Sequence, residues 1–224
     1  MVIYFVIVNT IAIYLFPGGS LYDPTLTSYS FSENFFSDLG VYETVSGEQN
    51  FLSCFLFNST LVMMGFACLS FILVPRLFKD NKISYVCATI GSYIAMLSGL
   101  SFLGVGLTPA DLYFHEHVFF VIVGFRSMVP AMVFLTLAFF FSPVSNKYTV
   151  ASVLFLLSIT LYAFFETSDP PDVSPRENLE LFKESVSYNR MVISVIAQKV
   201  ITLISFVSFF VFTYGFYQLS LLKK

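Results

Sequence analysis

The feature that most constrains this chain is the recurrence of long apolar runs separated by short polar connections. Each run approaches the ~20 residues that a helix needs to cross the ~30 Å hydrocarbon core of a bilayer. The runs lack the short alternating segments of barrel strands. Charged residues make up 11% of the chain, against about 25% in a soluble domain. These features predict an all-α polytopic membrane protein built as a bundle of six transmembrane helices.

The predicted spans form a single transmembrane domain, residues 1–224, in which the first helix is the shortest. About fifteen residues at ~1.5 Å each cover only ~23 Å, so this helix needs a thinner bilayer or further residues upstream. It lacks the basic start and the small-residue cleavage site of a signal peptide. The six spans are predicted at about 2–16, 51–74, 83–106, 114–141, 149–166 and 190–221.

Charged residues are sorted between two sets of connections. One set, which includes Arg76 and Lys79, is basic, and the other holds nearly every acidic residue. Because cytoplasmic loops are enriched in lysine and arginine, the basic set predicts that both termini lie in the cytoplasm. The acidic connections 17–50, 107–113 and 167–189 then face outward from a multi-pass protein of the cell membrane. An acidic exterior and a net charge of −3 argue against nucleic acid as a partner.

A short polar stretch in the first long connection, "SENFFSDLG" at 32–40, predicts a helix that lies along the membrane surface. Ser32 is suited to cap its N-terminus, and Gly40 to end it in a left-handed conformation. The two phenylalanines and Leu39 would share its apolar side. This arrangement would hold Asp38 at the edge of the bilayer.

Two further signals concern the third predicted span and the turn that follows it. Gly91, Ala95 and Gly99 are spaced four apart, a pattern that lets helices approach closely. In "LTPAD", Thr108 is suited to cap a helix and Pro109 to occupy its first turn. The sequence therefore predicts tight helix packing and a helix that starts at this turn.

Both histidines of the chain lie just after this turn, in "DLYFHEH". Asp111 and His115 are four residues apart on one helical face, so the carboxylate could orient the imidazole as a catalytic base. The same pair could instead bind a divalent metal such as zinc, with Asp38 and His117 completing the ligand set. A third interpretation is an interfacial histidine that only forms hydrogen bonds near the lipid headgroups.

Two cations are predicted to lie inside apolar spans, Arg126 and Lys199. Ionised groups at this depth cost at least a few kcal/mol each and rarely face lipid. Glu166 ends the fifth predicted span, and Tyr162 lies one turn before it on the same face. These residues are consistent with an internal salt-bridge network, with a pocket for an anionic headgroup, or with coupling to a proton or an ion. The acidic residues available as partners are Asp38, Asp111 and Glu166.

The order of these elements resembles the membrane family called domain of unknown function 998. Its members have an "I-S-x-L-G" element after the first helix, a "G-x-F-P-x-D" turn and a following histidine. Phe36 here replaces the isoleucine, and Leu107-Thr108 departs from the usual turn. The resemblance implies a six-helix fold, no established activity, and two polar elements that would be neighbours if they share one site. The matching residues are Ser37, Leu39, Gly40, Gly106, Pro109, Asp111 and His115 or His117.

The leading functional hypothesis is a lipid-handling protein with an outer-leaflet pocket for an anionic headgroup. Arg126 and Lys199 would hold the anion with Glu166 and Tyr162, and the Asp111–His115 pair would act at its edge. An alternative is a membrane-embedded hydrolase that uses the Asp/His cluster, with or without a metal. A further alternative is a structural or assembly subunit whose charges pair only internally.

Overall fold

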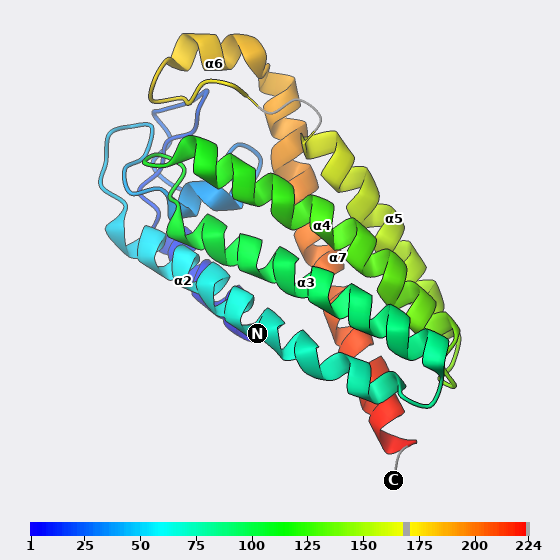
Figure 1. Ribbon diagram of the computed structural model, residues 1–224. Coiled ribbons are helices and arrows are strands. Elements are labelled where there is room, and N and C mark those ends of the chain that lie inside the picture. The colour runs from blue at the N-terminus through cyan, green and yellow to red at the C-terminus, as the bar shows by residue number, and fades with distance from the viewer. Residues whose placement is uncertain (168–170, 223–224) are drawn as a thin grey trace. The chain divides into compact units, whose positions relative to one another are not determined.

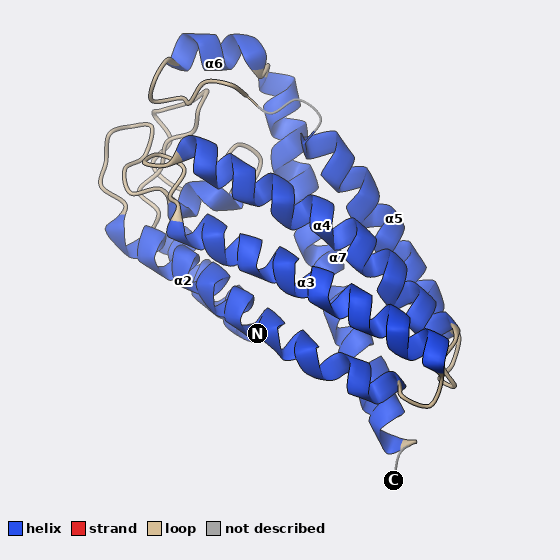
Figure 2. Cartoon of the chain, in the orientation of Figure 1, coloured by secondary structure: helices blue, strands red, loops and turns tan. Residues whose placement is uncertain are grey.

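The computed structural model describes residues 1–167 and 171–222, which form helices and turns and contain no strand (Figure 1, Figure 2). The all-α class predicted from the sequence is therefore confirmed. The helices are α1 (Val2–Leu15), η1 (Phe36–Gly40), α2 (Phe51–Cys68), η2 (Leu69–Phe78), α3 (Lys82–Leu107), α4 (Phe114–Phe140), α5 (Lys147–Thr167), α6 (Leu179–Ser185) and α7 (Tyr188–Leu221). Of these, η1 and η2 are 3₁₀ helices.

Five helical segments within the described ranges are long and apolar enough to cross a membrane. Only 28–39% of the most apolar window of each one is buried, so most residues in these windows keep some exposed surface. Such an apolar exterior is expected where lipid replaces water. The shorter α1 has 14 residues, or about 21 Å of helix. The five segments are Phe51–Phe78, Lys82–Leu107, Phe114–Phe140, Lys147–Glu166 and Tyr188–Leu221.

The chain divides into two compact units. The first contains residues 1–64, 102–121 and 166–200, and the second contains 65–101, 122–165 and 201–224. Each unit has its own packed interior.

Aromatic packing fills the second unit around Phe139, which is almost completely buried. Its ring centroid lies 5.4 Å from that of Phe216 and 5.6 Å from that of Phe78. Gly215 allows this approach, because a Cβ atom there would lie 3.0 Å from Tyr148 and 3.1 Å from Phe139. A side chain at position 215 would therefore push these rings apart.

The small residues of α3 do pack tightly, as the sequence predicted. A Cβ atom on Gly91 would lie 3.0 Å from the carbonyl oxygen of Ala131 on α4. A Cβ atom on Gly99 would lie 2.2 Å from the Cβ atom of Cys68 on α2. Gly91 thus allows close packing of α3 against α4, and Gly99 allows close packing of α3 against α2.

The change from α2 to the 3₁₀ segment η2 occurs upstream of Pro75. Proline has no N–H to donate and its ring crowds the preceding turn, so an α-helical ladder cannot run unbroken through this position. The result is a ten-residue 3₁₀ helix, longer than the usual three or four residues. Pro75 itself is buried, whereas Arg76 beside it is exposed.

In the first unit, the 17–50 segment is a folded loop. Two glycines let its start approach the backbone near Leu26. Gly18 and Gly19 have φ angles of +121° and +81°, a region that other residues rarely adopt. The N–H of Gly19 donates to the carbonyl oxygen of Leu26 at 2.9 Å. A Cβ atom on Gly18 would lie 2.2 Å from the same oxygen, so only glycine fits there.

The helix predicted over 32–40 is shorter than expected: it ends at Gly40 as predicted, but its predicted start and the left-handed conformation of Gly40 are wrong. η1 begins at Phe36, preceded by Phe35, so Ser32 caps nothing. Gly40 does not have a positive φ angle. Leu39 is fully buried within the unit, so the segment packs into the protein and its apolar side is not left at a membrane surface.

The helix start predicted at Thr108 is also wrong. The Thr108 hydroxyl donates to the carbonyl oxygen of Gly104 at 2.9 Å and so belongs to the end of α3. The N–H groups of Leu112 and Tyr113 then donate to the carbonyl oxygen of Pro109 in a turn. α4 starts only at Phe114.

Candidate functional site

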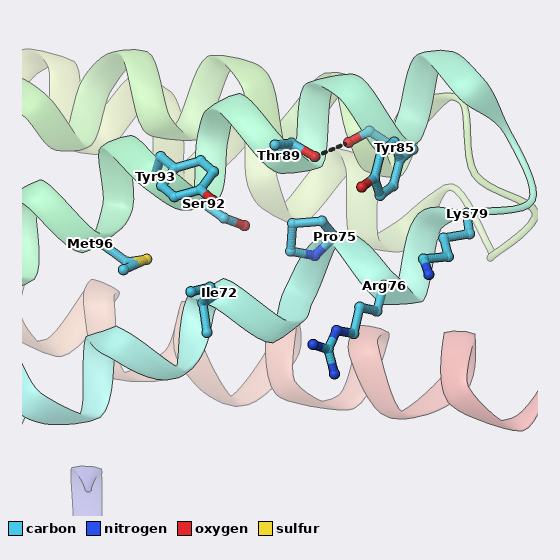
Figure 3. Close-up of a pocket in the computed structure, with 9 residues that line it drawn as sticks. All are labelled: Ile72, Pro75, Arg76, Lys79, Tyr85, Thr89, Ser92, Tyr93 and Met96. Atoms are coloured by element: carbon cyan, nitrogen blue, oxygen red, sulfur yellow. Dashed lines mark hydrogen bonds between the residues drawn. The ribbon is translucent and has the colours of Figure 1, made fainter.

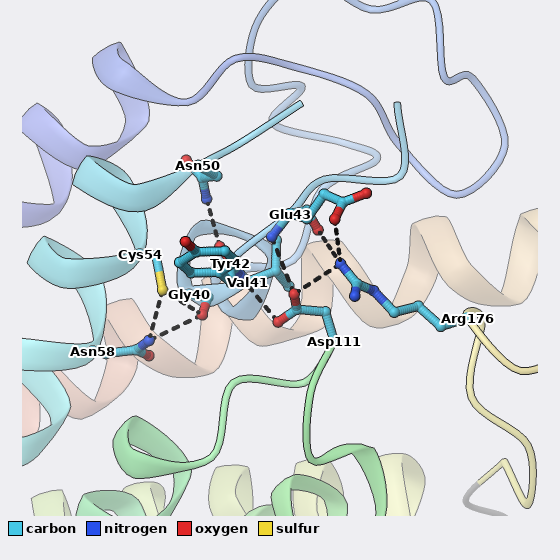
Figure 4. A network of polar contacts seen from close by, with 9 residues as sticks. All are labelled: Gly40, Val41, Tyr42, Glu43, Asn50, Cys54, Asn58, Asp111 and Arg176. Atoms are coloured by element: carbon cyan, nitrogen blue, oxygen red, sulfur yellow. Dashed lines mark hydrogen bonds and ion pairs between the residues drawn. The ribbon is translucent and has the colours of Figure 1, made fainter. Parts of the chain in front are cut away.

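Polar side chains at the start of α2 hold the carbonyl end of η1 (Figure 4). The amide nitrogen of Asn50 donates to the carbonyl oxygen of Leu39 at 3.1 Å, and the Ser53 hydroxyl donates to the same oxygen at 3.2 Å. The amide nitrogen of Asn58 donates to the carbonyl oxygen of Gly40 at 2.9 Å. These side chains satisfy carbonyl groups that the end of a short helix leaves without partners.

Asn58 lies against two glycines that are distant in the sequence. A Cβ atom on Gly40 would lie 2.6 Å from the side-chain oxygen of Asn58. A Cβ atom on Gly106 would lie 2.8 Å from the backbone oxygen of Asn58. Glycine is required at position 40 because of this close approach, and not because of a left-handed turn.

Asp111 holds the backbone just beyond η1 (Figure 4). Its two carboxylate oxygens accept from the N–H groups of Tyr42, at 3.0 Å, and Glu43, at 3.1 Å. Arg176 forms an ion pair with the same carboxylate at 3.0 Å and with that of Glu43 at 3.5 Å. The Asp111 side chain is only 5% exposed, so all its acceptors face protein donors. Asp111 thus fixes the backbone of the 17–50 segment at Tyr42 and Glu43, and this set of contacts is called the clamp.

Asn34 and Lys199 form a second attachment within the first unit. Lys199 is buried, and its ammonium donates to the carbonyl oxygen of Asn34 at 2.6 Å. The Asn34 side chain is also buried, and it donates to the carbonyl oxygen of Gly19 at 2.9 Å and accepts from the N–H of Ser30 at 2.9 Å. One asparagine therefore ties α7 to two turns of the 17–50 segment.

Aromatic rings surround the remaining faces of the Lys199 ammonium. Its nitrogen lies 5.4 Å from the ring centroid of Tyr29, 5.0 Å from that of Phe31 and 5.1 Å from that of Phe36. Such cation–π contacts stabilise a desolvated ammonium by about 2 kcal/mol. Asp38 adds an attractive charge without forming a direct ion pair. The sequence predicted a buried cation at this position. In the structure, the groups that stabilise its charge all belong to the 17–50 segment.

α7 also presents polar side chains one turn apart, at Arg190, Ser194 and Gln198. Gln198 accepts from the N–H of Phe36 at 2.7 Å. Ser194 is buried and hydrogen-bonds the carboxylate of Glu166 on α5, which also interacts electrostatically with Arg190. One oxygen of Glu166, Oε2, is buried and has no hydrogen-bond partner among the described residues. A buried acceptor of this kind calls for a donor that the described residues do not supply.

The two histidines have different surroundings. His115 is exposed at the start of α4, and its ring contacts Phe114. His117 is buried, with Nδ1 2.7 Å from the carbonyl oxygen of Thr108. The structure gives Asp111 backbone and arginine partners, and no hydrogen bond between Asp111 and His115 is present among them.

The four residues proposed as metal ligands, Asp38, Asp111, His115 and His117, are not gathered into one cluster. Asp38 accepts from the side chain of Asn34 and the N–H of Phe35, at 3.1 and 3.0 Å. Over residues 1–167 and 171–222, no group of three or more His, Cys, Asp or Glu side chains is placed to hold a metal ion.

The residues predicted to form an anion pocket fall in both units. Lys199 and Glu166 belong to the first unit, whereas Arg126 and Tyr162 belong to the second. Arg126 is exposed on α4. Tyr162 is buried, and its ring centroid lies 4.8 Å from that of Phe125. Within the first unit, Arg190 of α7 interacts electrostatically with Glu166.

Residues 10–178 match the model of a family described as "Protein of unknown function (DUF998)". The chain belongs to this family. No curated protein and no solved structure matches the chain. The resemblance read from the sequence is therefore confirmed.

The two elements that carried the DUF998 resemblance are in contact in the first unit. The first element ends at Gly40, and Asp111 of the second binds the N–H groups two and three residues further on. Asn58 adds a second link, because it lies against Gly40 and Gly106 alike. In this DUF998 protein, the matching residues therefore hold the 17–50 segment in place.

Several residues of this site carried little signal in the sequence. Asn34, Asn58 and Gln198 are uncharged, and Arg176 lies far along the chain from the acidic residues that it meets. Polar residues inside an apolar span do carry some information, because they rarely face lipid. Asn58 and Gln198 could have been selected on that ground, but their partners could not.

Asp38 gives this region a dependence on pH. Burial raises the pKa of the Asp38 carboxyl to about 6, and the Asn34 amide, the Phe35 N–H and the Lys199 charge partly oppose that rise. The pKa of an aspartate in an unfolded chain is about 3.9. The folded protein therefore binds the proton on Asp38 more tightly than the unfolded chain does. As the pH rises from about 4 to about 6, ionisation of Asp38 lowers the free energy of unfolding.

We expect Asp38→Asn to be more stable than wild type at neutral pH, with a difference that shrinks as the pH falls toward 4. The asparagine keeps an oxygen for the N–H of Phe35 and removes the buried charge, so the effect should reach a few kcal/mol. Melting temperatures of both proteins at several pH values measure it. The control is Asp23→Asn, because hydrogen bonds from Thr25 lower the pKa of Asp23 and give the opposite trend. A pH-independent difference between wild type and Asp38→Asn contradicts this account.

Proposed function

We propose that this protein is a lipid-handling membrane protein that binds an anionic headgroup at Glu166, Arg190 and Ser194. The observation that carries the proposal is the buried oxygen of Glu166, which has no hydrogen-bond partner in the described part of the chain. Ionisable groups that are buried within a membrane segment are costly and are usually kept for function. A lipid headgroup would supply the missing donor.

The chemistry of the cluster defines the headgroup that fits it. The Arg190 guanidinium suits a phosphate oxygen, because planar guanidinium groups bind phosphates through paired hydrogen bonds. The free oxygen of Glu166 suits a hydroxyl donor on the same headgroup. A phosphate that carries a glycerol meets both requirements, whereas a bare phosphate monoester meets only the first.

In this proposal, Lys199 and Asp111 position the site and do not bind the ligand. The ammonium of Lys199 already has a carbonyl oxygen and three rings around it. The carboxylate of Asp111 already has two backbone donors and an arginine. Their part is to fix the 17–50 segment against α7, next to the headgroup cluster.

The proposed topology has six spans with both termini in the cytoplasm, in a cell membrane. The sorting of basic and acidic connections supports this orientation. α1 would be the sixth span, and its 14 residues would be matched by local thinning of the bilayer. The 17–50 segment and the Glu166 cluster would then face the outer leaflet.

This topology predicts which single cysteines an impermeant thiol reagent reaches on intact cells. Cysteines at Ser28 and Glu48 should react, and cysteines at Val2 and Asp80 should not. Wild type measures the background from the native cysteines, which all lie in helices. Reaction at Val2 and Asp80 with none at Ser28 and Glu48 would reverse the orientation, and equal reaction at Val2 and Ser28 would show that α1 does not cross the membrane.

The lipid hypothesis predicts that phosphatidylglycerol raises the melting temperature of the purified protein in neutral detergent. A ligand at about 100 times its dissociation constant adds roughly 2.7 kcal/mol of stability. Arg190→Gln should lose this gain, and Glu166→Gln should respond no better to phosphatidylglycerol than to phosphatidic acid. The matched control is Lys183→Gln on α6, which removes one positive charge and should leave the response intact.

A different pattern would support the structural-subunit hypothesis. In that case wild type would melt at one temperature with or without lipid, and Arg190→Gln would be strongly destabilised because it strands a buried carboxylate. Such a result would remove the headgroup proposal. Equal loss of the response in Lys183→Gln would also remove it, because lipid would then act only through net charge.

A further inference from the structure

A cavity of about 160 Å³ lies in the second unit between η2 and α3 (Figure 3). Ser92 and Met96 lie toward one end of it, and Tyr85 and Lys79 lie toward the other. None of its nine lining residues is acidic, and two are cations. The lining residues are Ile72, Pro75, Arg76, Lys79, Tyr85, Thr89, Ser92, Tyr93 and Met96.

The side chain of Ser92 is the main evidence that this cavity binds a ligand. Its side chain is 1% exposed, and its hydroxyl oxygen is buried without a hydrogen-bond partner in residues 1–167 and 171–222. Figure 3 shows this hydroxyl directed into the space beside Pro75. Proline has no N–H to offer, and the nearby Thr89 hydroxyl already donates to the carbonyl oxygen of Tyr85 at 2.7 Å. A bound acceptor would satisfy the hydroxyl of Ser92.

The charge of the cavity selects the kind of acceptor. Arg76 lies in the last turn of η2 and Lys79 directly follows that helix, three residues later, and both line the cavity. Two cations and several hydroxyl groups, with no carboxylate, form a suitable environment for a tetrahedral oxyanion. We propose that this cavity binds a phosphate group, with Arg76 and Lys79 holding the charge and Ser92 donating to one oxygen.

The surroundings favour a phospholipid as the source of that phosphate. Ile72 and Tyr93 line the cavity and are 53% and 59% exposed, on segments that are long and apolar enough to cross a membrane. An acyl chain could therefore lie along them while the headgroup phosphate meets the cations. This site lies wholly in the second unit, and it does not depend on the Glu166 cluster or on the orientation of the chain.

The experiment uses the purified full chain in neutral detergent with a photoactivatable phosphatidic acid whose reactive group lies near the glycerol. Crosslinked peptides should map to residues 69–96 for wild type, and the same label on phosphatidylcholine should give far less. Ser92→Ala should reduce this labelling about tenfold, the effect of losing one hydrogen bond to a charged group. The paired Arg76→Gln, Lys79→Gln variant should abolish it.

Two controls keep the result interpretable. Ser92→Ala removes a hydroxyl that has no partner in the protein, so its melting temperature without lipid should not fall. Lys82→Gln removes a neighbouring cation that does not line the cavity, and should label like wild type. Arg190→Gln should also keep the labelling at 69–96, so failure of the headgroup proposal for Glu166 would not affect this test.

The source of the phosphate is tested in the same samples with millimolar inorganic phosphate. If phosphate raises the melting temperature of wild type but not of Ser92→Ala, and no lipid labels 69–96, the phosphate site stands with a free anion as its ligand. If labelling persists and phosphate competes weakly, the ligand is the lipid. The proposal is overturned if neither probe distinguishes wild type from Ser92→Ala.

Discussion

The burial of a positive charge inside an apolar helix is the constraint on which the first unit depends. Lipid offers the ammonium of Lys199 no hydrogen bond, so the protein must supply its partners. It does so with the carbonyl oxygen of Asn34 and the rings of Tyr29, Phe31 and Phe36. All four residues belong to the 17–50 segment. The buried ammonium on α7 is therefore stabilised only when the 17–50 segment is folded against it.

The same segment is held from its other end by side chains of α2 and the α3–α4 turn. Asp111 binds its backbone beyond η1, and Asn58 leaves room only for glycine at positions 40 and 106. These contacts explain why the residues that resemble the DUF998 family are short, polar and glycine-containing. They shape an ordered polar cap, in which a carboxylate that looked catalytic serves as an acceptor for backbone N–H groups.

Sequence reasoning succeeded where a periodic or compositional signal decides the outcome. The apolar runs predicted helices of membrane-spanning length, and Gly91 and Gly99 predicted close helix contacts. It failed where a contact between distant residues overrides a local signal. Gly40 does end η1, but glycine is needed there because of Asn58 and not because of a left-handed turn. Thr108 looked like the cap of a new helix, but its hydroxyl bonds back to Gly104 of α3. Arg176 could not be paired with Asp111 in advance, because nothing local connects them.

The central claim is that Asp111 and Lys199 hold the 17–50 segment in place through its backbone. Hydrogen exchange at single-residue resolution, on the protein in nanodiscs, tests it most directly. The N–H groups of Tyr42 and Glu43 should exchange slowly in wild type and in Arg176→Gln, because the exposed arginine contributes little to the clamp. They should exchange rapidly in Asp111→Ala, while the N–H of Phe36 on Gln198 stays protected. Rapid exchange at Tyr42 and Glu43 in wild type, or unchanged exchange in Asp111→Ala, would contradict the claim.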